Sequence, residues 1–318
     1  MKNYSVKFLL IAVMSAFISS ASASTVLVAD PQNSQVLSYD VTNGTWSQNG
    51  VFASASNAGG NGFANPRGIA TYGNNVYIAT SSNILRYDTS GNYLGSVLSV
   101  AGADGLATDS SGNLYYTVAF GGGATQGLYS ITDPTGSASN NLLAADNDIL
   151  RGIAIGGNGN IFVAERGAGV VTEYLTDGTL VGTFLSGVSY AQALSWDADN
   201  NRFLLGYSSA NDGFMVDLGS ISTSGVLSDV YDYQSGDASK FRTNLSVLNI
   251  DGTIYGSSFG SPANAIAEVD SLTDATTVVS GFAAGYMAEI NIPEPGTTAF
   301  FFGTLMLTLA FWRRRAAK

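Results

Sequence analysis

The sequence predicts an all-β protein built as a six-bladed β-propeller, in which the last strand of the chain completes the blade begun by the first. Three observations predict this fold. A short apolar segment recurs six times, two further strand-like segments follow each copy, and the strand missing from the first repeat stands at the end of the last. The composition agrees, because 38 glycines and only 6 prolines among many Tyr, Val, Ile and Thr residues favour short strands joined by turns.

The first strand-like segment of each repeat is strongly apolar. It reads TVLVAD, NVYIAT, NLYYTV, NIFVAE, RFLLGY and TIYGSS, starting at residues 25, 75, 113, 160, 202 and 253. The spacings of 50, 38, 47, 42 and 51 residues are close to the roughly 40–50 residues of a propeller blade. Most of these segments are apolar at consecutive positions, whereas a strand with one face in water alternates. The pattern therefore indicates sheets that neighbouring sheets cover on both sides.

Two more strand-like segments follow in every repeat. The second reads QVLSYD, NILRYD, GLYSIT, VVTEYL, GFMVDL and AIAEVD, starting at residues 35, 83, 127, 170, 213 and 265. The third reads WSQNGVF, YLGSVLS, NNLLAA, LVGTFL, LSDVYDY and TTVVSG, starting at residues 46, 93, 140, 180, 227 and 276. Turn sequences such as Asn43-Gly44 and Asp177-Gly178 separate them, as in β-hairpins.

A fourth segment precedes the first one in five of the repeats. It reads RGIATY, DGLATD, RGIAIG, QALSWD and TNLSVL, starting at residues 67, 104, 151, 192 and 243. The first repeat lacks it, and GYMAEINI at 285–292 supplies it from the other end of the chain. We therefore predict six blades of four strands in a ring without an open edge. A β-sandwich is the alternative, but 24 strands at this period exceed a normal sandwich.

Residues 1–23 predict a secretory signal peptide. Lys2 and Lys7 form a basic start, an apolar run follows over 8–18, and Ala21-Ser22-Ala23 is a small-residue cleavage site. A membrane anchor is the alternative, but the apolar run is short for a span. We expect an exported protein whose propeller domain covers 24–292.

Residues 293–318 combine three features in order. Pro293, Glu294 and Pro295 form a stiff, extended motif. The uncharged, mostly apolar stretch over about 297–312 predicts a single membrane helix. The tail over 313–318 begins with Arg313, Arg314 and Arg315 and predicts a cytoplasmic stop.

This arrangement resembles the PEP-CTERM sorting signal of Gram-negative bacteria. The resemblance implies that a membrane exosortase recognises the motif at 293–295 and removes the helix. It also implies a protein that is tethered to the inner membrane before processing, then reaches the cell surface or extracellular matrix, and is associated with exopolysaccharide and biofilm export. An ordinary tail anchor is the alternative.

Two further segments resemble NHL-type repeats. They are NPRGIATYGNNVYIATSSNILRYDTSGNYLG and LRGIAIGGNGNIFVAERGAGVVTEYLTDGTLVG. NHL-type repeats form six-bladed propellers, as do gluconolactonase-like enzymes. The resemblance covers about residues 24–292 and implies the fold far more than a function.

Composition and charge exclude several function classes. The chain has no cysteine and no histidine, which removes disulfides, Cys or His metal ligands, thiolate nucleophiles and imidazole bases. Residues 24–292 contain seven basic and 23 acidic residues, a formal charge of −16. Nucleic acid is therefore not an expected partner, because binding to phosphates needs a basic face. We expect no cofactor.

A candidate binding site follows from the repeat register. The innermost strand of each blade starts on one face of a propeller, so its first residue can line the mouth of the central channel. Those positions hold Arg67, Asp104, Arg151 and Gln192, with Thr243 and Gly285-Tyr286 in the remaining blades. The planar fork of arginine suits carboxylates, phosphates and sugars. In the alternative interpretation, both arginines pair with Asp104 and plug the channel.

Loops at 53–66, 119–126 and 259–264 lie on the same predicted face, where recognition is often located. Two function classes fit the sequence. The first is a non-enzymatic surface or matrix protein that binds a protein or an exopolysaccharide. The second is a metal-dependent, lactonase-like hydrolase, whose family holds a divalent cation with Glu, Asn and Asp oxygens at the channel mouth. Only Asp104 matches such a ligand, and two arginines beside it would repel the metal.

Overall fold

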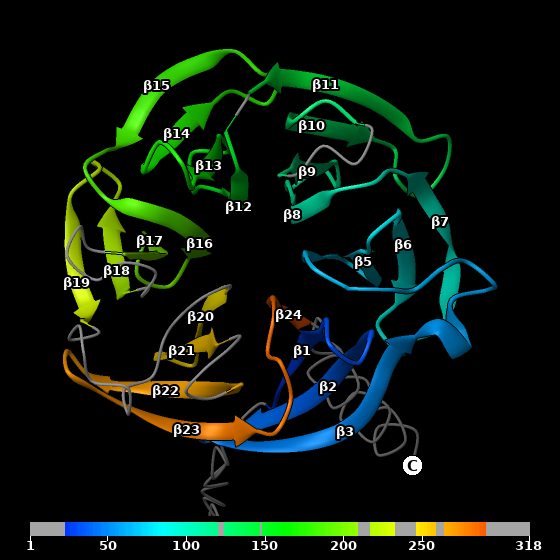
Figure 1. Cartoon of the computed structure of the whole chain (residues 1–318), viewed down its shortest axis with the longest axis horizontal. Coiled ribbons are helices and arrows are strands. Elements are labelled where there is room, and N and C mark those ends of the chain that lie inside the picture. The colour runs from blue at the N-terminus through cyan, green and yellow to red at the C-terminus, as the bar shows by residue number, and fades with distance from the viewer. Residues whose placement is uncertain are drawn as a thin grey trace, which may run out of the picture.

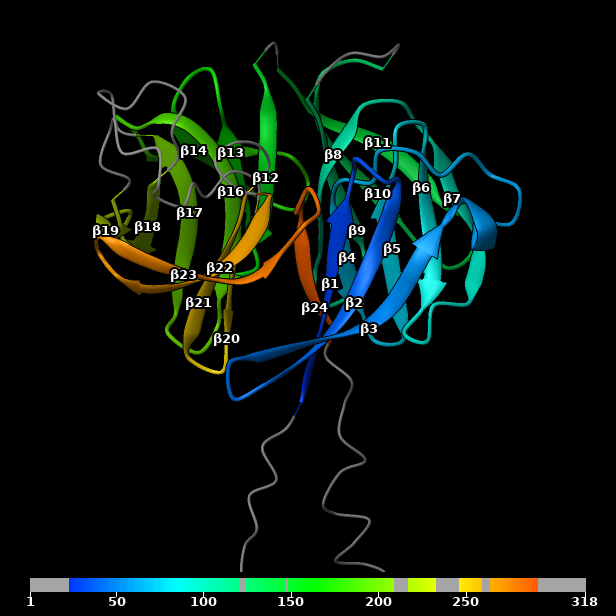
Figure 2. The same cartoon turned by 60° about the horizontal axis from the view of Figure 1, so that its bottom comes forward.

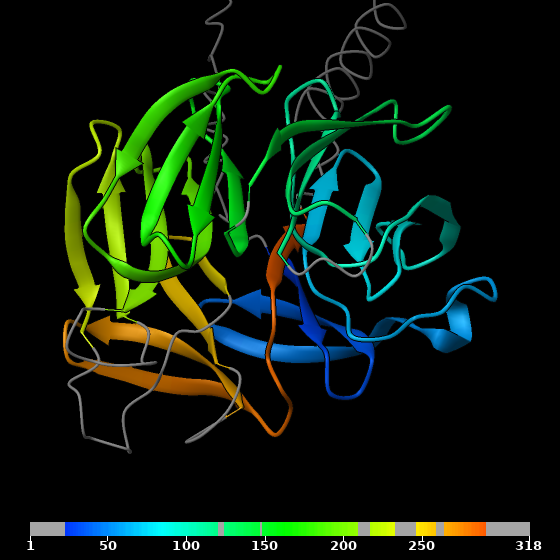
Figure 3. The ribbon, with the colours of Figure 1, turned by 45° about the horizontal axis from the view of Figure 1, so that its top comes forward.

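The computed structural model describes residues 23–119, 124–146, 148–208, 217–232, 246–258 and 264–290. Within these residues, 24 β-strands form six four-stranded antiparallel sheets, and one short 3₁₀-helix, η1 (Ala55–Asn57), follows β3. The sheets stand around a central axis like the blades of a propeller (Figure 1), and the tilted view of Figure 3 shows them side by side. The predicted all-β, six-bladed fold is confirmed.

Each blade contributes its strands in order from the axis outward. Blades 1 to 3 consist of β24 (Met287–Ile290), β1 (Ser24–Asp30), β2 (Gln35–Thr42) and β3 (Thr45–Ser54); β4 (Ile69–Tyr72), β5 (Asn75–Ala79), β6 (Asn83–Asp88) and β7 (Tyr93–Ser99); and β8 (Ala103–Thr108), β9 (Leu114–Val118), β10 (Gly127–Thr132) and β11 (Ser139–Ala145). Blades 4 to 6 consist of β12 (Leu150–Ile155), β13 (Ile161–Glu165), β14 (Val170–Tyr174) and β15 (Leu180–Leu185); β16 (Ser189–Asp197), β17 (Arg202–Ser208), β18 (Asp217–Ser222) and β19 (Leu227–Tyr231); and β20 (Ser246–Ile250), β21 (Thr253–Ser258), β22 (Ala265–Ser271) and β23 (Asp274–Ser280).

The predicted closure of the ring is confirmed. Strand β24 pairs antiparallel with β1, from Val28 opposite Met287 to Thr25 opposite Ile290. Figure 2 shows the two strands side by side, although more than 250 residues separate them in the sequence. Because they are antiparallel, β1 begins and β24 ends at the same face of the propeller. We call this face the lower face, and the opposite one the upper face.

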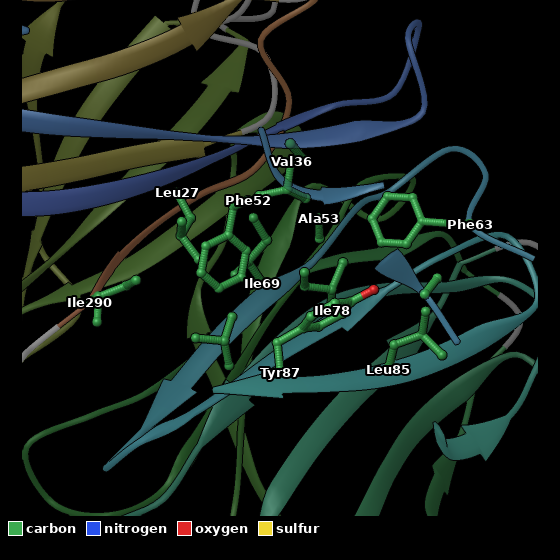
Figure 4. Close-up of a cluster of buried hydrophobic side chains, with 13 residues drawn as sticks. Leu27, Val36, Phe52, Ala53, Phe63, Ile69, Ile78, Leu85, Tyr87 and Ile290 are labelled. Atoms are coloured by element: carbon green, nitrogen blue, oxygen red, sulfur yellow. The ribbon is translucent and has the colours of Figure 1, made fainter. Parts of the chain in front are cut away.

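The interior consists of apolar seams between neighbouring blades. The second strands β1, β5, β9, β13 and β17 are almost completely buried, as their consecutive apolar positions predict. In the seam between blades 1 and 2, Leu27 and Phe52 pack with Ile69, Ile78 and Tyr87 (Figure 4). Each sheet is therefore covered on both faces, and removing any blade would expose two apolar surfaces.

Two strand positions differ from the prediction. In blade 5, Arg202 pairs with Ser222, so β18 covers Asp217–Ser222 and not the segment predicted from residue 213; residues 209–216 lie outside the described part. In blade 6, Ser246 pairs with Ser257, which places β20 two residues further along the chain than predicted. The position equivalent to Arg67 thus falls on residue 245 and not on Thr243, and both lie outside the described residues. A shift of two residues leaves the same side chains on the same face, so the apolar pattern alone could not detect it.

The predicted end segments are not tested by this fold. No helix among the described residues is long and apolar enough to cross a membrane. The predicted signal peptide except for Ala23, the motif of Pro293, Glu294 and Pro295, the span at about 297–312 and the arginines 313–315 all lie outside the described residues. Their roles remain predictions.

Candidate functional site

The structure brings three of the four predicted site residues together at the upper face. The Asp104 carboxylate, on β8, is completely buried, and its Oδ2 atom forms ion pairs with two arginines of the adjoining blades. Arg67 Nη1, just before β4, and Arg151 Nη1, on β12, each lie 3.1 Å from that oxygen. The Arg67 side chain is 29% exposed and that of Arg151 is 13% exposed. The arginines therefore do pair with Asp104. Because two guanidinium groups face one carboxylate, the group has a net positive charge, and the ion pairs fix the positions of both guanidinium groups.

Tyr286 completes this group. Its hydroxyl, just before β24, donates to Asp104 Oδ1 at 2.6 Å. Burial raises the pKa of Tyr286 well above its usual value, and the nearby negative charge of Asp104 raises it further. Tyr286 therefore stays protonated and acts as a hydrogen-bond donor. We call Asp104, Arg67, Arg151 and Tyr286 the Asp104 cluster.

The fourth predicted residue, Gln192, contacts the neighbouring blade through its backbone. It is buried on β16, and its carbonyl oxygen lies against Gly152 of β12, where an added Cβ would stand 2.5 Å away. The structure thus places Gln192 in the same layer as Arg151, on the neighbouring blade.

β-Bulges in the innermost strands affect the direction in which the side chains of the Asp104 cluster point. The innermost strands of blades 3, 4 and 5 each carry a register shift in this layer, at 103–106, 150–153 and 189–193. A bulge adds residues to one strand and turns the local side chains, and bulges are common next to functional sites. The blades also approach closely here, because Gly105 N–H bonds to Thr117 Oγ1 at 3.0 Å and this hydroxyl donates to the Arg151 carbonyl at 2.9 Å.

Gly105 is required for this close approach. A Cβ at this position would lie 2.3 Å from the Arg151 carbonyl oxygen. We therefore expect Gly105→Ala to force blades 3 and 4 apart and to lower the free energy of unfolding by about 1–3 kcal/mol. Chemical denaturation measures the change, with Gly62→Ala as control because the nearest atom to its added Cβ is 3.9 Å away. Equal midpoints for the two variants would contradict the proposed crowding.

A second polar group lies in the same region and was not predicted. The Arg166 guanidinium stands 5.0 Å above the ring of Tyr190, whose φ of 51° is unusual for a bulky residue. Burial, and then the like charge of Arg151, lower the pKa of Arg166. Burial, together with the carboxylates of Asp146 and Asp148, raises the pKa of Glu165. No sequence motif marks this group, because a left-handed tyrosine cannot be recognised from composition.

The central channel holds a cavity of about 310 Å³ below the Asp104 cluster. All six innermost strands line it, from Gly105, Gly152 and Tyr286 at its upper end to Thr71 and Glu289 at its lower end. Arg67, Asp104, Arg151 and Gln192 do not line it. The cavity lies below the channel mouth that we predicted at the upper face, and no feature of the sequence indicated it.

Among the described residues, no group of three or more acidic side chains could hold a metal ion. The Asp104 carboxylate itself is occupied by two ion pairs and one hydroxyl donor. Its arrangement fixes two guanidinium groups in space, which suits recognition of a carboxylate or of hydroxyl groups.

No protein family model matches this chain, and no curated protein matches it. Solved structures do share its fold. A chain in a nidogen–laminin complex aligns with a TM-score of 0.62 and 12% identity, over 84% of this chain and 98% of that one. A protein of unknown function from Bacteroides caccae aligns with a TM-score of 0.59 and 13% identity, over 85% of this chain and 100% of that one. The third structure is a catalytically inactive His-to-Ala variant of virginiamycin B lyase from Staphylococcus aureus with quinupristin. It aligns with a TM-score of 0.55 and 13% identity, over 86% of this chain and 94% of that one. These similarities show the six-bladed propeller fold and no function.

Proposed function

We propose that this chain is an exported, non-enzymatic propeller of the bacterial surface or extracellular matrix, which binds a protein or exopolysaccharide partner through its upper face. A signal peptide directs its export. An exosortase recognises Pro293-Glu294-Pro295 and removes the membrane helix, and the basic residues 313–315 remain in the cytoplasm until then.

The position of the two described chain ends carries this proposal. β1 begins and β24 ends at the lower face, opposite the Asp104 cluster. Residues 291–296 can reach at most about 20 Å, so a membrane helix that follows them keeps the lower face close to the bilayer. The upper face, with the loop at 53–66, then points away from the membrane and toward the partner.

Two observations support a binding role over catalysis. The ion pairs around Asp104 hold the carboxylate in place and leave it poorly suited as a general base or metal ligand. The virginiamycin B lyase variant with the same fold is inactive after loss of a histidine, and this chain contains no histidine. The protein therefore lacks the group on which that lyase depends.

Single cysteines test the orientation, because the chain has none of its own. Ala55→Cys places a thiol in exposed η1 at the upper face, and Leu272→Cys places one in the exposed β22–β23 turn at the lower face. Both are made in a chain kept uncleaved by Pro293→Ala, Glu294→Ala and Pro295→Ala, with intact mass confirming the retained helix. In membrane-bound material we expect an impermeant thiol reagent to label position 55 several times faster than position 272.

The same two variants test for the partner. On cells that retain their matrix, a partner at the upper face should slow labelling at 55 and leave labelling at 272 unchanged, and stripping the matrix should restore the rate. Detergent-solubilised protein, in which both sites are open, provides the reference rates. Faster labelling at 272 on membranes, or matrix protection at 272 alone, would contradict the proposed face.

A further inference from the structure

We propose that the upper face binds the carboxylate of a uronate sugar at the end of an acidic polysaccharide chain, at a site formed by Arg166, Arg151 and Arg67. This inference rests on the proposed function and deepens it, because it states which chemical group of the partner is recognised. It adds Arg166 and Tyr190, which lie outside the Asp104 cluster, to the binding surface.

Arg166 carries a positive charge that no carboxylate of the described residues neutralises. The ion pairs in this part of the chain involve Arg67, Arg151 and Arg202. Arg166 follows β13 directly, at the upper face, and its backbone N–H donates to the Ile149 carbonyl at 3.0 Å. Its side chain is partly buried. Because a charge that leaves water is ordinarily paired, an anion bound beside Arg166 would supply a partner that the described chain lacks.

A second positive charge acts on Arg166. Arg151 lies on β12, the innermost strand of the same blade, and its like charge adds to the effect of burial in lowering the pKa of Arg166. Arg151 and Arg67 already share the single carboxylate of Asp104. Three guanidinium groups therefore stand near one carboxylate, and an anion between Arg151 and Arg166 would relieve the repulsion between them.

Tyr190 holds the Arg166 side chain in place. It lies in the register shift of β16, with a φ of 51° that is costly for a bulky residue. Its ring centroid is 5.0 Å from Arg166 Cζ. This contact orients the guanidinium group without neutralising its charge or using its N–H donors. Strained backbone is concentrated at functional sites, and here the strain positions an arginine that can receive an anion.

The guanidinium groups can be reached from solvent. The side chain of Arg67 is 29% exposed, that of Arg151 is 13% exposed, and Arg166 is also partly exposed. A ligand can therefore approach the arginines from above the upper face without entering the central channel.

Acidic residues beside the arginines restrict the ligand to a single negative charge. Asp146 and Asp148 are partly exposed, and their charges add to the effect of burial in raising the pKa of Glu165. Residues 24–292 carry a formal charge of −16, so a polyanion lying across the surface would be repelled. A chain end that places one carboxylate at the arginines avoids most of this repulsion.

Hydroxyl groups on the ligand fit the same surroundings. The arginines can only donate hydrogen bonds, whereas the carboxylates of Asp146 and Asp148 can only accept them. A uronate provides a carboxylate for the arginines and ring hydroxyls for the acids. An acidic peptide provides carboxylates without hydroxyls, so the site favours the sugar.

The test compares three short oligomers. Trigalacturonate, its fully methyl-esterified form and triglutamate are each titrated into the purified full chain in detergent and followed by ligand-observed NMR. We expect trigalacturonate to bind and the other two to bind at least about tenfold more weakly, because the ester has lost the charge and the peptide lacks ring hydroxyls. Added salt should weaken trigalacturonate binding, since the site is partly exposed.

Substitutions assign the binding to Arg166. Arg166→Gln should reduce trigalacturonate affinity about tenfold, because it removes a charged hydrogen-bond donor. Arg166→Lys keeps the charge but loses the planar fork and should lose less. Arg86→Gln, at a partly buried arginine of β6 outside this group, is the matched charge control and should bind like the unchanged chain. Arg166→Gln removes no ion pair of the described chain, so its melting temperature should stay close to that of the unchanged chain.

Several results would overturn the proposal. They are absence of trigalacturonate binding, equal binding of the ester or of triglutamate, no effect of Arg166→Gln, and displacement of trigalacturonate by equimolar inorganic phosphate, which would leave a site for a simple anion only. The labelling of position 55 separates this outcome from the proposed function. Matrix protection at 55 without trigalacturonate binding would contradict the uronate and leave an upper-face partner, whereas trigalacturonate binding without protection would retain the site and contradict the matrix partner.

Discussion

Deleting residues 282–318 should abolish cooperative folding, whereas deleting residues 293–318 should leave a stable domain. The longer deletion removes β24, whose Met287 and Ile290 are buried against blades 1, 2 and 6. Loss of each such side chain costs about 2–5 kcal/mol, and the backbone bonds to β1 and the Tyr286–Asp104 contact are lost as well. Together these losses approach the whole stability of a typical domain, about 5–15 kcal/mol. Thermal and chemical unfolding of the two truncations, with light scattering for aggregation, measures the difference.

A circular permutant provides the rescue control. Because β24 ends where β1 begins, residues 285–291 can precede Ser24 through a two-residue Asn-Gly turn and re-form the same antiparallel pair in the same register. The permutant should recover most of the stability that the 282–318 deletion loses. Equal melting temperatures for the two truncations would show that β24 does not close the ring, and failure of the permutant alone would assign the loss to residues 282–284.

The repeat made the architecture predictable, while details of register required the structure. TVLVAD and its five counterparts recur at the spacing of a propeller blade. The first repeat lacks its innermost strand, so the extra strand-like segment at 285–292 could be assigned to the position beside Thr25. The two-residue shift of β20 could not be seen in the sequence, because every second side chain of a strand points to the same face and a shift by two residues leaves the apolar pattern unchanged. The start of β18 was misplaced because GFMVDL is more apolar than the observed DLGSIS.

The candidate site was predictable in position and only partly in its contacts. Counting along equivalent strands brings Arg67, Asp104 and Arg151 into one layer, and the structure joins them through ion pairs. Tyr286 lies 182 residues from its hydrogen-bond partner Asp104. Asp104 itself lies in the β-bulge between Ala103 and Leu106, which the local sequence pattern does not indicate.

Replacing Asp104 should destabilise the propeller more than any other single polar substitution in the cluster. Asp104→Ala leaves the guanidinium groups of Arg67 and Arg151 and the hydroxyl of Tyr286 pointing at a site without an acceptor. Breaking a buried ion pair from one side costs about 3–5 kcal/mol, and the partial exposure of Arg67 places the expected loss at the lower end. Asp104→Asn retains one acceptor and should lose less. Chemical denaturation at fixed pH measures both, with Asp199→Ala in an exposed turn as the control.

The triple variant Asp104→Leu, Arg67→Leu and Arg151→Leu separates the two possible reasons for the loss. If the single variant is unstable because it leaves uncompensated positive charge, removal of all three charges should restore much of the stability, since apolar replacement of a whole buried network is often neutral or favourable. If packing of the carboxylate were responsible, the triple variant would be the least stable of the series. A loss below about 1 kcal/mol for Asp104→Ala would contradict the structural importance of the cluster, because it would place these pairs among ordinary surface ion pairs.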